Sequence, residues 1–396
     1  MNIIYLDNSA TTRIKSEVLD EMMPFLTTEY GNASSLYSIG RKAKKSLENA
    51  RKQVAELLNC KPTEIFFTSG GSESDNLALK GFAYANRGKG NHIITSKIEH
   101  HAILETCETL ARQGFEISYI DVDDDGIINI EKLKENIKPT TILISVMAAN
   151  NEIGTIQPIK EIAEIAHSHN ITFHTDAVQG VGNMPIDVEE MQIDMLSLSG
   201  HKIGAAKGTG AIYIRSGIKV EKLINGGKQE RDQRAGTENI AGVVGLGKAC
   251  EIANKNIETH IKNLARLRNY YISRLQKEIP NKFRINGTLE KRLPGNANIS
   301  FEGLNSSELI FKLDEKGICV SSGSACSSGE TEPSYVLKAI NVPEKYLNSA
   351  IRTTFGDNNT FGQIDYLVNC IKNEQRANPQ TQSRVNEQEF WKCKNL

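Results

Sequence analysis

Short apolar runs alternate with amphipathic helical patterns through residues 64–215, and no other feature restricts the fold as strongly. The runs are bounded by polar turns and have the lengths of strands. Helical patterns at residues 101–114 and 158–170 separate several of them, and the second opens with Pro158, which suits a first helical position. This alternation predicts a mostly parallel sheet with helices on both faces. The strand-like runs are residues 64–68, 92–96, 115–120, 141–147, 171–175, 195–199 and 210–215.

The regular alternation of strand-like and helical patterns ends in the last third of the chain. A long helical pattern at residues 258–279 is followed by a strand-like stretch at 297–303 and by helical stretches at 306–317 and 361–375. Such a mixture predicts a second, smaller α+β domain. The expected division is a large cofactor-binding α/β domain at residues 16–260 and a small α+β domain formed by residues 1–15 and 261–396.

Charge and cysteine content exclude several classes of function. Lys and Arg total 47 against 48 Asp and Glu, so nothing indicates a nucleic-acid or membrane partner. No stretch approaches the ~20 apolar residues of a membrane span, and the first residues lack a signal-peptide pattern. The seven cysteines include no C-x-x-C pair, which argues against structural zinc and against a dithiol centre. We therefore expect a protein of the reducing cytoplasm.

No intrinsic metal site is expected. The stretch "DVDDDG", residues 121–126, imitates the start of an EF-hand loop, but the twelfth position from Asp121 is Lys132 where the motif requires glutamate. A solvated turn is the better interpretation.

Two residues at strand ends indicate the chemistry. Lys202 follows the run 195–199, at the edge of an open α/β sheet where ligands bind. A partly desolvated lysine there can form a Schiff base with a carbonyl cofactor. Asp176 follows the run 171–175; alone it would suggest only a helix cap. Together the two residues fit pyridoxal 5'-phosphate (PLP), whose ring nitrogen is kept protonated by a carboxylate.

A cradle for the cofactor phosphate is also present. The run 64–68 leads into Gly70 and Gly71 and then into a helical pattern, so unpaired backbone N–H groups of a first helical turn face an anion. Glycine pairs mark many ordinary turns. This pair indicates a phosphate site only because the same chain also contains Asp176 and Lys202 in a plausible order.

The motifs as a set resemble the cysteine desulfurases of the NifS and IscS type, up to about residue 370. The resemblance implies a fold-type I PLP enzyme and a homodimer with active sites at the subunit interface. The segments that carry it are "YLDNSATT", "TSGGSESDN", "EHHA", "NNEIGTIQPI", "HTDAVQ", "SGHKIGAAKGTG", "RAGTEN" and "SSGSACSSG".

The resemblance also implies residue roles. Lys202 would hold the cofactor covalently, His100 would stack on its ring, and Asp176 would bind the ring nitrogen. Arg352 resembles the arginine that grips the substrate carboxylate, a role that suits a bidentate donor; the alternative is a surface ion pair. Further cofactor and phosphate contacts are expected from Gly71, Ser72, Asn151, Gln179, Ser199, Gly200, His201 and, from the other subunit, Thr237, with Asn151 also at the substrate edge.

Cys326 lies in "SSGSACSSG", between residues that build adaptable loops. By the resemblance it would attack the sulfur of bound L-cysteine, take it as a persulfide, leave L-alanine, and carry the sulfur to an acceptor protein, expected to be an iron-sulfur scaffold. Cys326 could also transiently ligate a cluster shared with that scaffold. Glycine and serine on both sides provide the mobility that attack and delivery require. The alternative is an idle loop cysteine, and Cys393 has no assignable role.

Two rival functions remain open at this stage. One is a selenocysteine lyase or another β-eliminating PLP enzyme, which would work without Cys326. The other is a regulatory protein that keeps the fold and senses redox state through Cys326, and it would be colourless.

Overall fold

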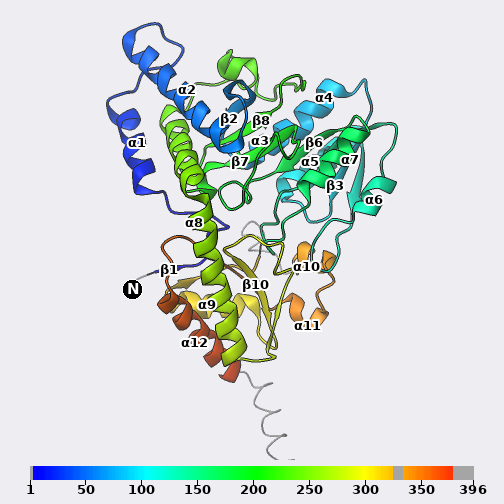
Figure 1. The fold of residues 1–396 in the computed structure, drawn as a ribbon, viewed down its shortest axis with the longest axis vertical. Helices are drawn as coiled ribbons and strands as arrows, with labels where there is room; N and C mark the ends of the chain where they lie inside the picture. Colours follow the sequence, from blue (N-terminus) through cyan, green and yellow to red (C-terminus); the bar gives the residue numbers. More distant parts are fainter. Residues whose placement is uncertain (1–2, 324–332, 378–396) are drawn as a thin grey trace, which may run out of the picture.

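A seven-stranded sheet forms the centre of the larger part of the molecule in the computed structural model, which describes residues 3–323 and 333–377 (Figure 1). The strand order is β2-β8-β7-β6-β5-β3-β4. Neighbours from β7 to β4 pair in parallel, whereas β8 runs antiparallel to both β2 and β7. The predicted mostly parallel sheet is confirmed, and each predicted run supplies one strand. The strands are β2 (Ile65–Thr68), β3 (His92–Ser96), β4 (Glu116–Ile120), β5 (Thr141–Ser145), β6 (Thr172–Asp176), β7 (Met195–Ser199) and β8 (Gly210–Ile214).

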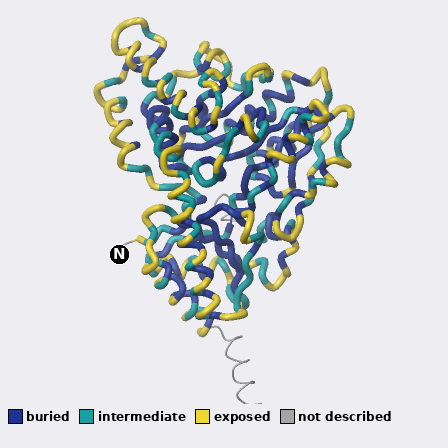
Figure 2. The backbone as a smooth tube through the Cα atoms, viewed as in Figure 1, coloured by how far each residue is buried: buried dark blue, intermediate teal, exposed yellow. Residues whose placement is uncertain are grey.

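Helices cover both faces of this sheet, and its central strands are buried along their length (Figure 2). Successive side chains of a strand point to opposite faces. Accordingly Ile94 packs into one apolar cluster and its neighbour Ile93 into another on the opposite face. The helices of this part are α1 (Ser16–Thr27), α2 (Ser38–Leu58), α3 (Gly71–Asn76), α4 (Phe82–Asn86), α5 (His101–Arg112), α6 (Ile130–Glu135) and α7 (Ile159–Ser168).

A second, antiparallel sheet lies in the smaller part of the molecule, in the order β12-β10-β9 (Figure 1). A short parallel pair, β1 with β11, brings the N-terminus to this part. The sheet has its own apolar core, which includes Leu6, Phe301 and Ile351. The elements are β1 (Ile4–Tyr5), β9 (Phe283–Ile285), β10 (Asn296–Phe301), β11 (Ile318–Cys319), β12 (Ala350–Thr354), α9 (Ser306–Asp314), α10 (Tyr335–Ala339), α11 (Glu344–Leu347) and α12 (Phe361–Ala377).

Helix α8 (Ile240–Glu278) joins the two parts, and its start corrects the sequence-based expectation of residue 258. Its first turns carry glycines, which disfavour an isolated helix. Here they allow close approach of other helices: a Cβ on Gly245 would lie 2.6 Å from Met22 Sδ of α1, and one on Gly247 would lie 2.6 Å from Ala50 Cα of α2. Tertiary packing therefore overrides propensity. The expected domain boundary near residue 260 falls inside this helix, and the division stays a prediction.

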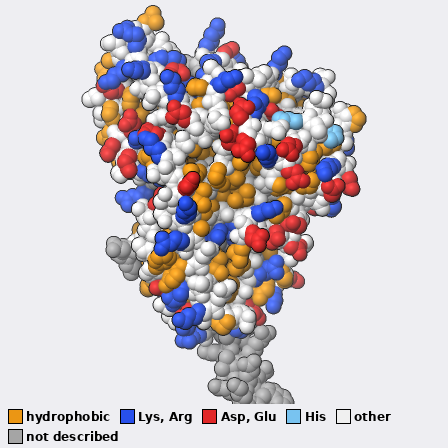
Figure 3. All heavy atoms as spheres, viewed as in Figure 1, with side chains coloured by type: hydrophobic (Ala, Val, Ile, Leu, Met, Phe, Trp, Pro, Cys, Tyr) orange, Lys and Arg blue, Asp and Glu red, His pale blue; other side chains and the backbone are white. Residues whose placement is uncertain are grey.

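The surface carries both signs of charge side by side over the face shown in Figure 3, with apolar side chains gathered near its centre. This mixture accords with the near-zero formal charge of -1. Within residues 3–323 and 333–377, no helix has the length and apolar character needed to cross a bilayer.

Candidate active site

The site lies where β6, β7 and the turn after β2 meet. Strands β6 and β7 are parallel neighbours, so Asp176 at the end of one lies beside Ser197 of the other. Lys202 follows β7 in a single helical turn, Gly200–Lys202. Because parallel strands end at one edge of the sheet, the aspartate and the lysine meet there, as the sequence predicted.

A glycine turn faces this edge. Gly70 has φ +154°, a conformation that side chains disfavour, and it leads into α3. A Cβ on Gly71 would lie 2.6 Å from Val178 Cγ2 and 3.7 Å from Ser199 Cβ. Glycine at these two positions therefore keeps open a backbone cradle beside Ser199. Ser72, in the first turn of α3, is exposed, and Gly200 donates its N–H to Thr209 O at 2.9 Å.

Asp176, which is buried, and His100, which is half-buried, form the centre of the site. Asp176 Oδ1 accepts a hydrogen bond from Val178 N at 2.9 Å. His100 caps α5, and its Nδ1 accepts from Ala102 N at 3.1 Å, so the neutral ring carries its hydrogen on Nε2. Burial lowers the pKa of His100. Burial raises the pKa of Asp176, while the positions of His100 and Lys202 oppose that rise.

The N-terminal segment closes one side of the site. Lys202 Nζ donates to the carbonyl oxygens of Ser9 and Ala10, the second at 2.9 Å. Gln179 Nε2 donates to the same Ser9 oxygen at 3.0 Å. His201 Nδ1 lies 3.1 Å from Thr11 Oγ1, and burial, reinforced by the Lys202 charge, lowers the pKa of His201 to about 4. His201 is therefore a neutral ring at pH 7.

Arg352 reaches the site from β12. Its Nη1 donates to Asn151 O at 2.9 Å and its Nη2 to Asp7 Oδ1 at 2.7 Å. Arg352 is only 1% exposed, so the surface ion pair considered as an alternative is wrong: the pair with Asp7 is buried. Arg352 Nε and Asn151 Oδ1 have no hydrogen-bond partner within the described residues. Both are polar atoms available to a ligand.

The described residues do not place two of the predicted site residues, Thr237 and Cys326, at this centre. Thr237 is exposed in the loop before α8, which accords with a contact across a subunit interface but does not test it. Cys326 and Cys393 lie outside the described residues.

Three residues of the site were missed by sequence reasoning. Asp7 pairs with Arg352, Ser9 receives Lys202 and Gln179 through its backbone, and Asp75 of α3 lies beside Asp176. All three belong to motifs that carried the resemblance, "YLDNSATT" and "TSGGSESDN". The motifs indicated that these segments matter, but a backbone acceptor or a buried carboxyl has no local signature.

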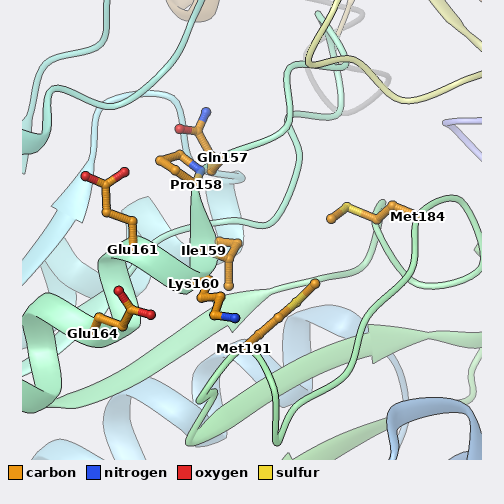
Figure 4. Close-up of a pocket in the computed structure, with 8 residues that line it drawn as sticks. All are labelled: Gln157, Pro158, Ile159, Lys160, Glu161, Glu164, Met184 and Met191. Atoms are coloured by element: carbon orange, nitrogen blue, oxygen red, sulfur yellow. The ribbon is translucent and has the colours of Figure 1, made fainter.

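A surface hollow of about 420 Å³ lies apart from these residues (Figure 4). It is formed by the start of α7, from Gln157 to Glu164, together with Met184 and Met191. None of the predicted site residues that the structure describes lines it, so it is separate from the site described above.

Comparison with known proteins decides the family, since the aminotransferase class-V model matches residues 4–367. The chain belongs to the class-V aminotransferase family. The cysteine desulfurase IscS of Clostridium botulinum (strain Hall) is 50% identical over 370 residues, 93% of each chain. That of Methanosarcina thermophila is 50% identical over 368 residues, 93% of this chain and 91% of its own. A solved NifS-like protein has TM-score 0.89 at 38% identity, covering 94% of this chain and 99% of its own.

These findings confirm the resemblance read from the motifs, and with it the fold type, the enzyme class and the cofactor. The class-V aminotransferase chain is a PLP-dependent cysteine desulfurase. The residues fit the cofactor on structural grounds as well: the Gly70–Gly71 cradle faces Ser199, Asp176 supplies a buried carboxyl group, and Asn151 Oδ1 has no partner in residues 3–323 and 333–377. The individual residue roles stay predictions.

Proposed function

We propose that this desulfurase passes the sulfur of L-cysteine to Cys326. The Cys326 thiolate attacks the substrate sulfur, a new S–S bond forms, and the carbon–sulfur bond breaks. The electron pair of that bond goes to the substrate β-carbon, which takes up a proton. L-Cysteine and one thiol thus become L-alanine and one persulfide, and no outside oxidant or reductant is consumed.

The cofactor residues have distinct parts in this proposal. PLP, when bound, withdraws electrons from the substrate α-carbon. Lys202 holds it covalently and moves protons at the substrate. Asp176 receives the protonated ring nitrogen, and the neutral ring of His100 stacks on the cofactor. The support is the burial of Asp176 and the convergence of the three residues at the edge formed by β6 and β7.

The two ends of the ligand have separate binding groups. For the phosphate we propose Gly71, Ser72, Ser199, Gly200 and His201, with Thr237 from the other subunit. The position of Gly71 against Ser199 and the neutral His201, which can donate from a ring nitrogen, support this set.

Arg352 binds the substrate carboxylate, with Asn151 and Gln179 at the substrate and cofactor edge. Arg352 Nε supports this role, because it is a buried donor that no acceptor among the described residues satisfies. The observation that carries the proposal is the meeting of Lys202, Asp176 and His100 at the edge of the sheet formed by β6 and β7.

A direct test is mass spectrometry of the Cys326 peptide after exposure of the holoenzyme to L-cysteine without reductant. One added sulfur on Cys326, with alanine released, is expected. Cys326→Ser should keep the visible band of the bound cofactor and release no alanine. The matched control is Cys319→Ser, since Cys319 is half-buried in β11 and burial raises the pKa of its thiol. Sulfide release by Cys326→Ala would instead indicate the β-eliminating rival.

We further propose a cytoplasmic homodimer that delivers sulfur to an iron-sulfur scaffold. The exposed Thr237, which the proposed site requires from a second subunit, supports the dimer. Mixing inactive Lys202→Ala subunits with inactive Thr237→Val subunits tests it. Recovery of activity in the mixed dimers is expected if each site takes Thr237 from its partner, and no recovery would contradict that sharing.

A further inference from the structure

Two buried carboxyl groups stand side by side in the site, and the desulfurase chemistry described above uses only one of them. Asp75 is 1% exposed and Asp176 is 5% exposed. Asp75 comes from α3 and Asp176 from the end of β6. One side-chain ligand atom from each of Asp75, His100 and Asp176 lies within 4.8 Å of the others. Two like charges this close and this buried cannot both persist at low cost.

The surroundings differ for the two carboxyls. Asp176 receives the N–H of Val178 and faces His100 and the Lys202 ammonium. Its anionic form therefore has a donor and a cation nearby.

Asp75 has less support: a hydrogen bond with Ser197 favours its anionic form, but none of the described groups that face it is a cation. Its Oδ1 has no hydrogen-bond partner among the described residues. The groups facing it are Asp176, Glu99, Ser197 and His174, whose Nε2 lies 3.9 Å away. His174 is fully buried, and burial lowers its pKa to about 3, so it is neutral and supplies no positive charge. Burial first and the Asp176 charge second raise the pKa of Asp75.

We propose that Asp75 is a positioning residue that keeps its proton and so confines the single negative charge of the pair to Asp176, the partner of the cofactor ring nitrogen. The inference rests on the proposed role of Asp176. Helix α3 strengthens it, because the same helix begins at Gly71 and Ser72 and carries Asp75 one turn later. One short element then fixes the phosphate end and the ring-nitrogen end of the ligand together.

The test compares Asp75→Asn, which mimics the neutral acid, with Asp75→Leu, which has similar size and no polar group. Both are made as full-length holoenzymes. The readouts are the dissociation constant of PLP and the pH midpoint of the visible band of the bound cofactor. Asp194→Asn is the matched control, because Asp194 is buried beside the opposite end of β6, where it accepts from Phe173 N.

If Asp75 is neutral, Asp75→Asn keeps the midpoint to within about 0.3 pH unit and keeps the PLP affinity. If Asp75 were a second anion, its loss would lower the midpoint by about two units, since a charge a few ångströms away would be removed. Asp75→Leu should weaken PLP binding about tenfold through loss of the polar contact with Ser197. Unchanged binding by Asp75→Leu, or a shifted midpoint in Asp75→Asn, would overturn the inference.

The failure of the proposed function is a separate result: the wild-type protein would then show no visible band with PLP. If Asp75→Asn does not fold, infrared spectra of wild-type holoenzyme with isotope-labelled aspartate decide the matter. A labelled protonated-carboxyl band at pH 8 that survives in Asp194→Asn and is lost in Asp75→Leu supports a neutral Asp75, and absence of the band from the wild type contradicts it.

Discussion

Arg352 Nη2 lies 2.7 Å from Asp7 Oδ1, and the pair joins the segment after β1 to the central part of β12. Arg352 also donates to Asn151 O, from the loop after β5. The guanidinium is thus held on two sides, and its Nε has no acceptor within the described part of the chain. Asp7 orients the Arg352 guanidinium through this ion pair. A substrate carboxylate bound to Arg352 would share the guanidinium with Asp7.

Arg352→Lys is expected to raise the KM for L-cysteine by roughly 10- to 100-fold, with a smaller effect on kcat. Lysine keeps the charge but loses the planar fork that can hold Asp7 and a second carboxylate at once. Steady-state alanine formation measures both parameters. Arg268→Lys is the control, because Arg268 is another buried arginine, held on α8 near Leu293 O. An equal rise in KM for both variants would assign the effect to general packing.

Lys202→Ala is expected to remove the covalently bound cofactor and abolish turnover while the fold remains. The cost in unfolding free energy should be about 1–2 kcal/mol, since the Ser9 and Ala10 carbonyls lose a donor. Absorbance and circular-dichroism melting test the two effects. The exposed Lys207 provides the control variant Lys207→Ala. A visible band in Lys202→Ala with the spectrum of the wild type would contradict the assignment.

The sheet was predictable from sequence because its central strands are buried on both faces and form short, mostly apolar runs. Residues 92–96 and 195–199 coincide with β3 and β7. The antiparallel direction of β8 was not predictable, since strand direction leaves no mark on a run such as Gly210–Ile214.

The site also contains some residues that sequence could predict and others that it could not. Lys202 and Asp176 follow strands, and strand ends converge by topology, so their neighbourhood could be predicted. The contacts of Ser9 and Asp7 join segments that are far apart in sequence. Lys202 and Ser9 are separated by 193 residues, and Arg352 and Asp7 by 345. Only the folded chain shows them. The burial of Arg352 likewise depends on the pairing of β12 with β10, and the sequence pattern did not predict a strand at β12.

Glu99→Gln is expected to become more stable than wild type as the pH rises. Glu99 is fully buried, with Ser96 and the N–H of Met147 as donors, and burial raises its pKa to about 8. A raised folded pKa gives stability below pH 4.5 that is lost as the pH rises toward 8. Removing this titration should shift the difference in unfolding free energy by about 4 kcal/mol between pH 5 and pH 8.

Urea denaturation at both pH values measures that difference. Glu64→Gln gives the opposite sign, because hydrogen bonds from Ser216 and Lys61 lower the pKa of Glu64 despite its burial. Its contribution is present above pH 4.5 and is lost as the pH falls. A pH-independent difference for Glu99→Gln would mean that Glu99 is ionised in the fold.

Gly323→Ala is expected to destabilise the protein and to reduce sulfur loading of Cys326. Gly323 has φ +145°, and a Cβ there would lie 2.7 Å from Glu152 Oε2. Glu152 cannot easily move, because it is 1% exposed and Ser334 Oγ donates to the same oxygen at 2.6 Å. Glu152 therefore accepts a hydrogen bond from Ser334 and fills the space beside Gly323, the described residues on either side of the segment 324–332 that contains Cys326.

The matched control for that substitution is Gly217→Ala, since Gly217 also has positive φ, +97°, but a Cβ there would meet nothing within 4 Å. Both variants incur the backbone strain, so their difference isolates the contact with Glu152. We expect Gly323→Ala to lose about 1–3 kcal/mol more unfolding free energy than Gly217→Ala. Single-turnover mass spectrometry should show less persulfide on Cys326 in Gly323→Ala alone, with the visible cofactor band unchanged. Equal stability and equal loading in the two variants would mean that the Glu152 contact yields without consequence and that the path of the chain at Gly323 does not govern the cysteine.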